Sequence, residues 1–457
     1  MTDRRLDAIV VGGGIAGLAS AWALRERDVL LLEADSRVGG RICSEPRGNY
    51  WLNWGAHVFA GPESATGRLM QDVGVHAEPV PGELAGLAMN GRVLTDGRVE
   101  TYPFRVPMTW RDRAAVLRAG IKVRRAVRSY GKIAQARPDD APGELQQRVY
   151  DFLGDRTFEQ FTGRLPADAD AMFRPTVTRS AGAPDQISAG AGVGYFRLVW
   201  DRKSGLSRNI PGGSSTLTDA IAAHLGDRVV LGAEVVGVAQ DDDGVRVRYR
   251  RGGTETELRA RHCVLAIPAP IARRLATGLA PQTDDALGKV VYGSLVSAAF
   301  LTNESTPQPW DHCYAIAAPK RAFNICLNTT SLIRSREQTR QPGSSIMVFS
   351  PAALATALLE LDDQQIIDRY IKDLEDIFPG FSRLVVEAHV RRWPLGLAYC
   401  FPGRGNIQAA LTLPGARIHL AGDYLGTFYT DTAIETGSRA ASTILRDLHA
   451  HPGFGSA

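Results

Sequence analysis

The chain has 457 residues, of which 44% are hydrophobic and 22% charged, and its formal net charge is +4. This length and composition exclude a disordered or fibrous protein and allow two or more domains with a sizeable core. The mild charge does not require a nucleic-acid partner, and no apolar run is long enough to span a bilayer.

The first forty residues predict a strand, a glycine turn, a helix and a second strand. An apolar run at residues 8–11 leads into Gly12-Gly13-Gly14-Ile15-Ala16-Gly17, and a second run at residues 29–32 ends at Glu33. Gly12 permits the sharp turn, Gly14 lets the backbone approach a pyrophosphate, and Gly17 lets the helix pack closely on the strand.

The same segment predicts dinucleotide binding. The helix that begins near Ile15 and Ala16 offers free N–H groups to phosphates, and Glu33 follows at the spacing of an acid that binds ribose hydroxyls. A glycine turn that only packs a helix on a sheet is the alternative. Because strand, helix and acid all occur together, we expect a nucleotide site and a redox enzyme.

An extension follows the acid: Ala34, Arg37 and the run Gly39-Gly40-Arg41. It resembles the start of the flavin-containing amine oxidase and protoporphyrinogen oxidase superfamily. The resemblance implies FAD as the cofactor, with this segment following the pyrophosphate toward the flavin ring. Gly55, Ala56 and His57 match a family segment that lies beside the flavin. His57 fits equally well a buried histidine that bonds only to protein atoms.

Residues 111–137 form a long basic segment with apolar residues at helical spacing. It fits a helix on a membrane surface or a solvated helix of a substrate domain, and we favour the solvated helix because runs of charge usually face water. Residues 138–143 predict a loop, and a helical pattern resumes to about Phe161. The glycine-rich residues 190–194 are interpreted as a loop because they lack GxGxxG spacing and a preceding strand. Without a second dinucleotide motif, we expect the substrate itself to reduce the flavin.

Residues 210–217 resemble the second glycine signature of the family and precede a predicted helix to about Leu225. Strands are predicted at residues 229–231, 234–238, 245–249 and 262–267, with a hairpin turn at residues 241–244. The resemblance implies that Val235 meets the adenine edge and that Ala266 lies in the flavin domain.

Residues 292–301 predict a substrate-domain strand. Many amine oxidases of the family place a lysine in this strand, near flavin N5, whereas Ser297 takes that position here. The difference moves the chain toward the protoporphyrinogen-oxidase and desaturase-like branches. Residues 361–378 predict an amphipathic helix. Trp393 and Tyr399 are candidate cavity residues, and Cys400 does not match the spacing of a covalent attachment, so we expect non-covalent FAD.

Residues 417–423 predict a strand that ends in Gly422-Asp423, followed by a helix from about residue 432 to 448. The resemblance places Asp423 near the diphosphate and ribityl chain. It also places the helix start at Thr432 and Ala433 against the flavin, where a helix dipole stabilises negative charge on the reduced ring. Phe428 and Tyr429 precede this helix and are candidates for the cavity wall or for ordinary core packing.

We therefore expect an α/β fold with a Rossmann-like FAD-binding domain (residues 1–85, 205–280 and 390–457) and an inserted α+β substrate domain (residues 86–204 and 281–389). The expected reaction is hydride transfer from a C–N or C–C bond of a small substrate to flavin N5, with O2 or a quinone as the acceptor. A protoporphyrinogen oxidase, a flavin-dependent isomerase or mutase, and a non-enzymatic nucleotide-binding module remain as alternatives.

The cysteine pattern bears on the compartment. The five cysteines are scattered and form no CxxC pair, and only a few residues precede the first strand, so no signal peptide is predicted. We expect a cytoplasmic protein with no structural metal site, no nucleic-acid partner, and at most a peripheral membrane contact through residues 111–137.

Overall fold

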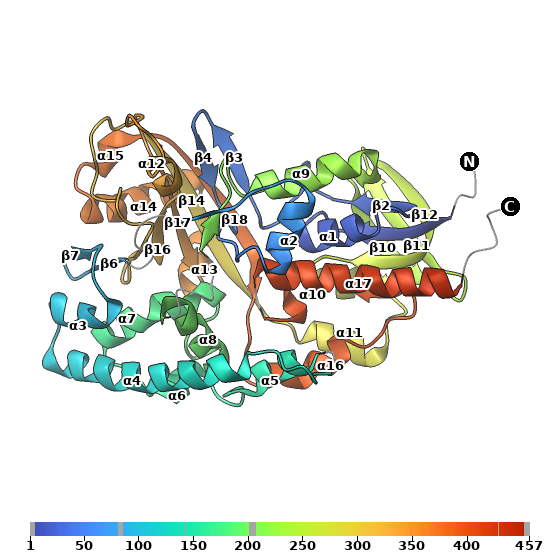
Figure 1. Ribbon diagram of the computed structural model, residues 1–457, viewed down its shortest axis with the longest axis horizontal. Coiled ribbons are helices and arrows are strands. Elements are labelled where there is room, and N and C mark those ends of the chain that lie inside the picture. The colour runs from blue at the N-terminus through green and yellow to red at the C-terminus, as the bar shows by residue number, and fades with distance from the viewer. Residues whose placement is uncertain (1–4, 81–85, 142, 201–206, 428, 452–457) are drawn as a thin grey trace.

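Two large β-sheets organise the molecule and occupy its two halves (Figure 1). The computed structural model describes residues 5–80, 86–141, 143–200, 207–427 and 429–451. The first sheet is built from strands far apart in the sequence: β1 (Leu6–Val11), β2 (Val29–Leu32), β9 (Val229–Val230), β10 (Glu234–Gln240), β11 (Val245–Arg251), β12 (Thr254–Leu265), β13 (Ala276–Thr277) and β19 (Ile418–Leu420).

The centre of this first sheet is parallel. Strand β1 lies between β2 and β12, β9 extends the sheet beyond β2, and β19 pairs with the C-terminal part of β12. The antiparallel hairpin of β10 and β11 continues the sheet from the other part of β12. The predicted hairpin turn is confirmed, because Asp241 donates its N–H to the carbonyl of Gly244 over 2.9 Å.

The parallel strands end at a common edge. Val11 is in register with Leu32 and Leu265, and Leu265 is in register with Leu420. The glycine turn, the acid after β2 and the segments after β12 and β19 therefore leave the sheet together. In open α/β sheets, ligands bind at this carboxyl edge.

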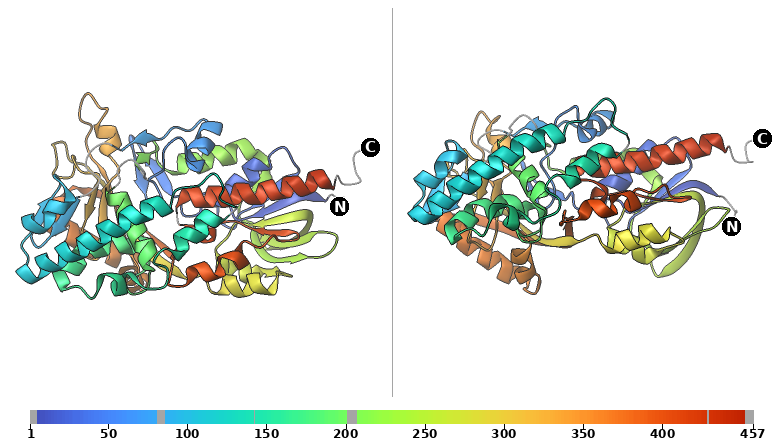
Figure 2. Two further views of the ribbon diagram at one scale, coloured as in Figure 1. Left: turned by 60° about the horizontal axis from the view of Figure 1, so that its bottom comes forward. Right: turned by 90° about the horizontal axis from the view of Figure 1, so that it is seen from below.

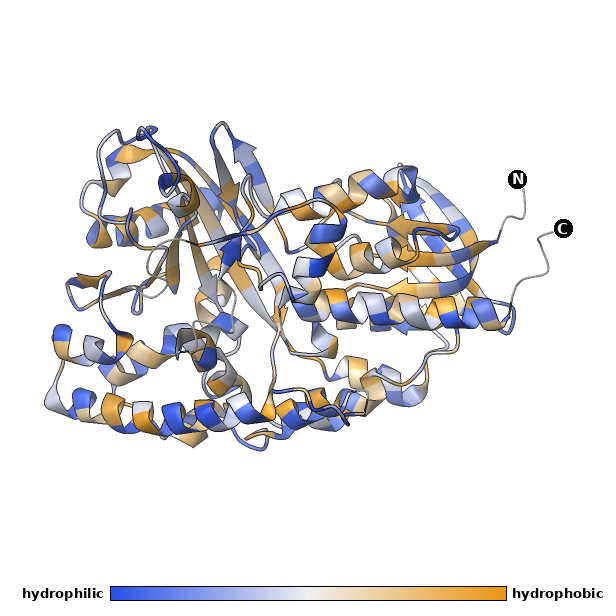
Figure 3. Cartoon of the chain, viewed as in Figure 1, coloured by the Kyte–Doolittle hydropathy of each residue, from blue (hydrophilic) through white to orange (hydrophobic). Residues whose placement is uncertain are grey.

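Helices cover both faces of the first sheet (Figures 1 and 2). On one face, α1 (Ile15–Ala23) and α17 (Thr430–Ala450) cross closely enough that a Cβ on Gly437 would lie 2.2 Å from the carbonyl oxygen of Ala16. Further helices around this sheet are α2 (Ala65–Asp72), α9 (Ser215–Leu225), α10 (Ala269–Leu275), α11 (Pro281–Gly288) and α16 (Gln408–Leu411). The apolar side chains of β1 are buried between these layers. Figure 3 shows hydrophobic stretches along the strands of this sheet.

The second sheet is mostly antiparallel. Its long central strand β14 (Tyr292–Thr302) pairs on one side with β18 (Val385–Ala398) and on the other with β17 (Ser345–Pro351). The remaining strands are β16 (Ile325–Asn328), β15 (Ala315–Ala317), β6 (Gly86–Met89) and β7 (Arg92–Leu94). The ribbons β3 (Ser44–Arg47) with β4 (Tyr50–Asn53), and β5 (Glu78–Pro79) with β8 (Arg208–Asn209), are separate two-stranded sheets.

The second sheet has its own core. Helix α14 (Asp363–Ile377) packs on it with α12 (Ser331–Arg334), α13 (Ala353–Leu359) and α15 (Phe381–Leu384) nearby. The predicted amphipathic helix is confirmed: Asp362 caps it in a reciprocal capping box with Gln365, and its apolar side buries Tyr370 completely.

A layer of helices lies beside the second sheet (Figure 2). It consists of α3 (Tyr102–Arg105), α4 (Trp110–Ile133), α5 (Glu144–Asp151), α6 (Phe158–Thr162), α7 (Ala167–Val177) and α8 (Ala189–Trp200). The helix predicted for residues 111–137 is confirmed as α4. The helical pattern predicted up to Phe161 forms two helices, α5 and α6. A capping box at Thr157 begins the second of them.

The loop predicted for residues 190–194 is wrong, because these residues form the first turns of α8. The glycines serve close packing rather than a turn. A Cβ on Gly192 would lie 2.4 Å from the ring of Phe158, and one on Gly190 would lie 1.8 Å from the carbonyl oxygen of Phe152. Burial against neighbouring helices overrides the low helix propensity of glycine.

The predicted α/β fold class is confirmed, with a parallel core sheet and a second, mostly antiparallel sheet. The residue boundaries of the two domains stay a proposal. No helix in the described parts of the chain combines the length and apolar character needed to cross a bilayer.

Candidate functional site

The glycine turn after β1 has the geometry of a phosphate loop. Gly12 has φ = +101°, and a Cβ there would lie 2.7 Å from the carbonyl oxygen of Ala266. A Cβ on Gly17 would lie 1.9 Å from the carbonyl oxygen of Gly12. At Gly14, by contrast, a Cβ would meet no protein atom within 4 Å. Gly12 and Gly17 are therefore required by the protein itself, whereas Gly14 borders open space at the start of α1, formed by Ile15 and Ala16.

Glu33 and its neighbours close the turn from the side of β2. The Glu33 carboxylate accepts hydrogen bonds from the N–H of Gly13 and from the N–H of Asp35, the latter over 2.8 Å. Ala34 is exposed beside it. The Glu33 carbonyl accepts a hydrogen bond of 2.8 Å from the N–H of Ala233, so buried Val235 follows within two residues of this contact. The acid and the proposed adenine-edge residue thus belong to one neighbourhood.

The second glycine pair lies directly against the first turn. The N–H of Gly39 donates to the carbonyl of Gly13 over 2.8 Å, and a Cβ on Gly40 would lie 3.3 Å from the Cα of Gly14. Both glycines have positive φ, +101° at Gly39 and +55° at Gly40. The Arg37 guanidinium donates to three backbone carbonyls of this loop, the shortest of these bonds being 2.7 Å to Gly40. Arg37 therefore fixes the loop that the glycines shape.

Arg41 joins the two ends of the sequence. Its guanidinium binds the Asp423 carboxylate through two bonds, 2.9 Å to Oδ2 and 2.8 Å to Oδ1, and also donates to the carbonyl of Gly396 over 3.0 Å. Asp423 is 7% exposed and Arg41 35% exposed. Burial alone would lower the pKa of Arg41, but the charge and hydrogen bonds of Asp423 raise it above its ordinary value. This forked pair fixes Gly422-Asp423 beside the Gly39-Gly40 loop.

The segment Gly55-Ala56-His57 lies beside Arg41. The N–H of Ala56 donates to the Arg41 carbonyl over 2.9 Å, and a Cβ on Gly55 would lie 2.1 Å from that same oxygen. His57 is 7% exposed, and its Nδ1 bonds to the Gly55 carbonyl over 2.8 Å, while its buried Nε2 has no hydrogen-bond partner among the described residues. Burial lowers the pKa of His57 to about 4. The ring is therefore neutral near pH 7, and its Nε2 can accept a hydrogen bond.

The neutral burial of His57 predicts acid sensitivity. Its folded pKa lies below the unfolded value, so the unfolded state binds the proton first as pH falls. The free energy of unfolding should drop by up to about 3 kcal/mol between about pH 6.5 and about pH 4 through this group. A His57→Gln variant should lose less stability over that window in denaturant titrations. An equal loss in both proteins would contradict the assignment, because the two remaining buried histidines, His262 and His419, contribute to both.

His57 belongs to a cluster of buried aromatic and polar groups. Its ring centroid is 6.3 Å from that of Tyr314, whose hydroxyl accepts a hydrogen bond of 3.1 Å from the Asn209 amide. The Asn209 Oδ1 is buried and unpartnered in the described part of the chain. Tyr195 and Tyr429 form an edge-to-face pair with centroids 6.1 Å apart.

The charge of one cation acts on both ring pairs. Arg179, half-buried in the 3-10 turn Thr178–Ser180, acts on the pKa of Tyr314, Tyr429 and His57. Burial raises the pKa of both tyrosines and the Arg179 charge opposes that rise, while at His57 burial and this charge both lower the pKa. No carboxylate pairs with Arg179 within the ranges that the structure describes. The cluster therefore carries a positive charge among neutral rings.

The candidate cavity residues separate into two groups. His57 and Tyr429 belong to the Arg179 cluster, and the Tyr399 ring packs against Gly182, where a Cβ would lie 3.0 Å from it. Trp393 does not join them: its Nε1 donates to the Ser297 hydroxyl over 3.2 Å, and Ser297 donates to the carbonyl of Trp54 over 2.8 Å. Phe428 lies outside the described residues.

The start of α17 faces the same edge of the first sheet. Tyr429 precedes the helix with φ = +103°, a strained value for a residue with a Cβ. Asp431 accepts hydrogen bonds from the N–H and the hydroxyl of Thr66, which ties α2 to this helix. Thr432 lies in the first turn, where backbone N–H groups lack intrahelical acceptors, and the N–H of the following Ala433 bonds to the Tyr429 carbonyl over 3.4 Å. The helix start can thus stabilise negative charge on a bound group.

The sequence prediction missed Arg179, Tyr195, Tyr314 and Asn209. A single arginine and scattered tyrosines carry no spacing signal, because the fold alone brings them together from four segments. Among the described residues, no group of three or more His, Cys, Asp or Glu side chains could hold a metal ion. All five cysteines are buried, and none of them forms a disulfide bond.

Comparisons with known proteins agree with this geometry. A family model described as flavin-containing amine oxidoreductase matches residues 15–445. Flavin-containing amine oxidase A of Canis lupus familiaris is 25% identical, over 97% of this chain and 85% of its own. Coproporphyrinogen III oxidase of Mycobacterium tuberculosis is also 25% identical, over 96% of this chain and 98% of its own. A putrescine oxidase structure with bound putrescine shares the fold, with a TM-score of 0.76, 19% identity and coverage of 97% and 99%.

Proposed function

Because the chain belongs to the flavin-containing amine oxidoreductase family, we propose that it removes a hydride from a C–N or C–C bond of a small organic substrate and returns the electrons to O2. It is an FAD-dependent oxidoreductase, which excludes the alternative of a non-enzymatic nucleotide-binding module. FAD supplies the two-electron acceptor, and the protein supplies binding, orientation and electrostatics. The choice of substrate and of O2 is the proposal.

The residues present fit FAD bound without a covalent link. The observation that carries this proposal is the open space at Gly14, next to Gly40 and at the start of α1, where a pyrophosphate would meet backbone N–H groups. Asp423, fixed by Arg41, lies where the ribityl chain would pass, and Thr432 and Ala433 would meet the flavin. Gly55, Ala56 and Val235 complete the proposed contacts.

We further propose that the substrate carries a carboxylate. Arg179 supplies the charge that supports this class, because a guanidinium binds carboxylates through matched donors. The unpartnered Nε2 of His57 and Oδ1 of Asn209 lie in the same cluster and would orient polar substrate groups. A dication such as a diamine would be repelled by Arg179 rather than bound.

Porphyrinogen oxidation is the second candidate. The observation that favours it is Ser297, which takes the position where many amine oxidases of the family have a lysine. Its buried hydroxyl is hydrogen-bonded to Trp54 and Trp393 and provides no cation near the flavin. A propionate-bearing porphyrinogen also meets the carboxylate requirement. A flavin-dependent isomerase or mutase has no such supporting observation.

Anaerobic flavin reduction tests the proposal. The purified protein would be mixed with amino acids, with the amines formed by their decarboxylation, and with porphyrinogens, and bleaching of the flavin followed. We expect a carboxylated compound to bleach the flavin and its decarboxylated counterpart to react at least about tenfold more weakly. Arg179→Gln should raise the apparent Kd for the carboxylated compound by about ten- to a hundredfold without loss of FAD. Faster reduction by the decarboxylated amines, or an unchanged Kd in the variant, would contradict the carboxylate.

A further inference from the structure

Helices α3 and α4 lie beside the second sheet, away from the first (Figures 1 and 2). They carry an exposed apolar stripe formed by Phe104, Trp110, Leu117 and Ile121. The exposed fractions are 80% at Trp110, 59% at Phe104, 55% at Ile121 and 41% at Leu117. Trp110, Leu117 and Ile121 follow the spacing i, i+7 and i+11, so they share one side of α4. Arg113 lies over the rings of Trp110 and Phe104, at 4.8 Å and 6.0 Å from their centroids, which joins α3 to this stripe.

The opposite side of α4 already serves the core. Ala115, Ala119, Val123 and Val127 are buried there against the helical layer. The apolar stripe therefore does not contribute to the hydrophobic core. Contiguous exposed apolar side chains of this size mark a surface that meets another apolar phase or partner.

Basic residues flank the stripe along the whole helix. Exposed cations of α4 are Arg111, Arg118, Lys122, Arg124, Arg125, Arg128 and Lys132. The one acidic residue of α4, Asp112, is buried and accepts hydrogen bonds from Thr109 and from the N–H of Asp168. Among these cations, Arg124 has an acidic neighbour, Glu100, at 3.6 Å.

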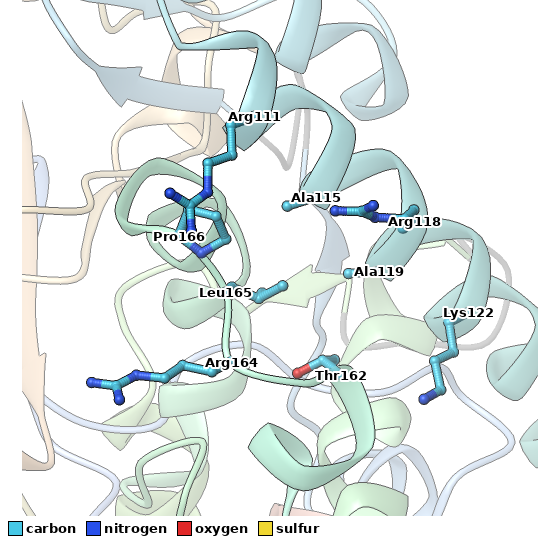
Figure 4. Close-up of a pocket in the computed structure, with 9 residues that line it drawn as sticks. All are labelled: Arg111, Ala115, Arg118, Ala119, Lys122, Thr162, Arg164, Leu165 and Pro166. Atoms are coloured by element: carbon cyan, nitrogen blue, oxygen red, sulfur yellow. The ribbon is translucent and has the colours of Figure 1, made fainter.

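A groove of about 510 Å³ lies between α4 and the segment of residues 162–166 (Figure 4). Its charged lining residues are Arg111, Arg118, Lys122 and Arg164, and its other lining residues include Thr162 and Leu165. No carboxylate lines it. The Lys122 ammonium bonds to the Phe161 carbonyl, while no acid pairs with the three arginines in the described part of the chain. The groove suits a phosphate-bearing group.

We propose that the α3–α4 surface docks on an anionic lipid bilayer, with the apolar stripe in the interface and lipid phosphates in the basic groove. A helix with aromatic and aliphatic residues on one side and Lys/Arg at its borders is the form that lies in a membrane interface. A second copy of the chain fits this surface poorly, because a symmetric dimer would set the same cations against each other. The docking is independent of the substrate proposed above.

Vesicle sedimentation of the FAD-loaded protein tests the docking. We expect pelleting with vesicles that contain phosphatidylglycerol, little with pure phosphatidylcholine, and weakening by salt. Trp110→Ser/Ile121→Ser and Arg118→Glu/Arg125→Glu should each reduce pelleting at least about tenfold at limiting lipid, while FAD content and thermal unfolding stay as in the wild type.

Matched controls come from exposed residues elsewhere. Leu413→Ser removes an exposed apolar side chain, 45% exposed, and Arg259→Glu reverses an exposed cation on β12. Both controls should pellet as the wild type does. Equal pelleting with both kinds of vesicle, no pelleting of the wild type, undiminished pelleting of the two double variants, or a dimer abolished by Trp110→Ser/Ile121→Ser would each overturn the proposal.

Discussion

Replacement of Gly14 by alanine is expected to leave the protein folded and to weaken FAD binding by about tenfold or more, at least about 1.4 kcal/mol. Gly14 has φ = −67°, which alanine adopts freely, and its added Cβ would meet no protein atom within 4 Å. The methyl group would instead enter the space where the pyrophosphate approaches the backbone. The ratio of flavin to protein absorbance after gel filtration, and an FAD titration of the apoprotein, measure the effect.

Gly17→Ala is the matched control, since it adds the same methyl group three residues further along. Its Cβ would lie 1.9 Å from the Gly12 carbonyl oxygen, so this variant should destabilise the apoprotein itself, by about 1–3 kcal/mol. Thermal unfolding of both apoproteins separates the two effects. Wild-type FAD affinity in Gly14→Ala, or an equal loss of apoprotein stability in both variants, would contradict the proposed site.

Asp423→Asn is expected to lower both stability and FAD retention. It leaves the partly buried Arg41 guanidinium without a counter-charge, at a cost on the order of 2–3 kcal/mol because Arg41 keeps some contact with solvent. The link between the Gly39-Gly40 loop and Gly422 would also loosen. Denaturant unfolding and FAD dissociation would measure the two losses.

Asp35→Asn is the control for this second variant. The Asp35 carboxylate is 55% exposed and 3.7 Å from Arg37, so its removal should change stability by less than about 1 kcal/mol. If Asp423→Asn behaved like Asp35→Asn in both measurements, the forked pair would have no role in holding the two segments together.

The sequence predicts best where a short segment determines its own structure. The turn from Gly12 to Gly17 and the capped helix α14 follow from local steric and capping rules, and both are confirmed. The start of α17 is also predicted to within two residues. In each case, a few neighbouring residues contain all the required information.

Long-range packing limits the prediction elsewhere. By local propensity, the glycines at 190, 192 and 194 predict a loop. In the structure they lie in α8, where rings and carbonyl groups of neighbouring segments approach so closely that a Cβ would not fit without a shift. The role of Arg179 cannot be predicted from the sequence for a related reason. Its charge acts on His57, Tyr314 and Tyr429 only because the tertiary fold brings these segments together. Trp393 is a cavity candidate by resemblance, and that role stays a prediction: its bond to Ser297 places it apart from the Arg179 cluster, in the packing between β14, β18 and β4.

The Arg41–Asp423 bridge has a consequence for the order of folding. The two residues are 382 positions apart, and β1 likewise pairs with β12, whose own partner β19 comes still later in the sequence. Contacts that close such long loops form late and slowly. During synthesis, the glycine turn therefore emerges long before the sheet that holds it. We therefore expect FAD to bind only after the distant segments have come together. The flavin absorbance of a preparation then measures the fraction of chains that have folded completely.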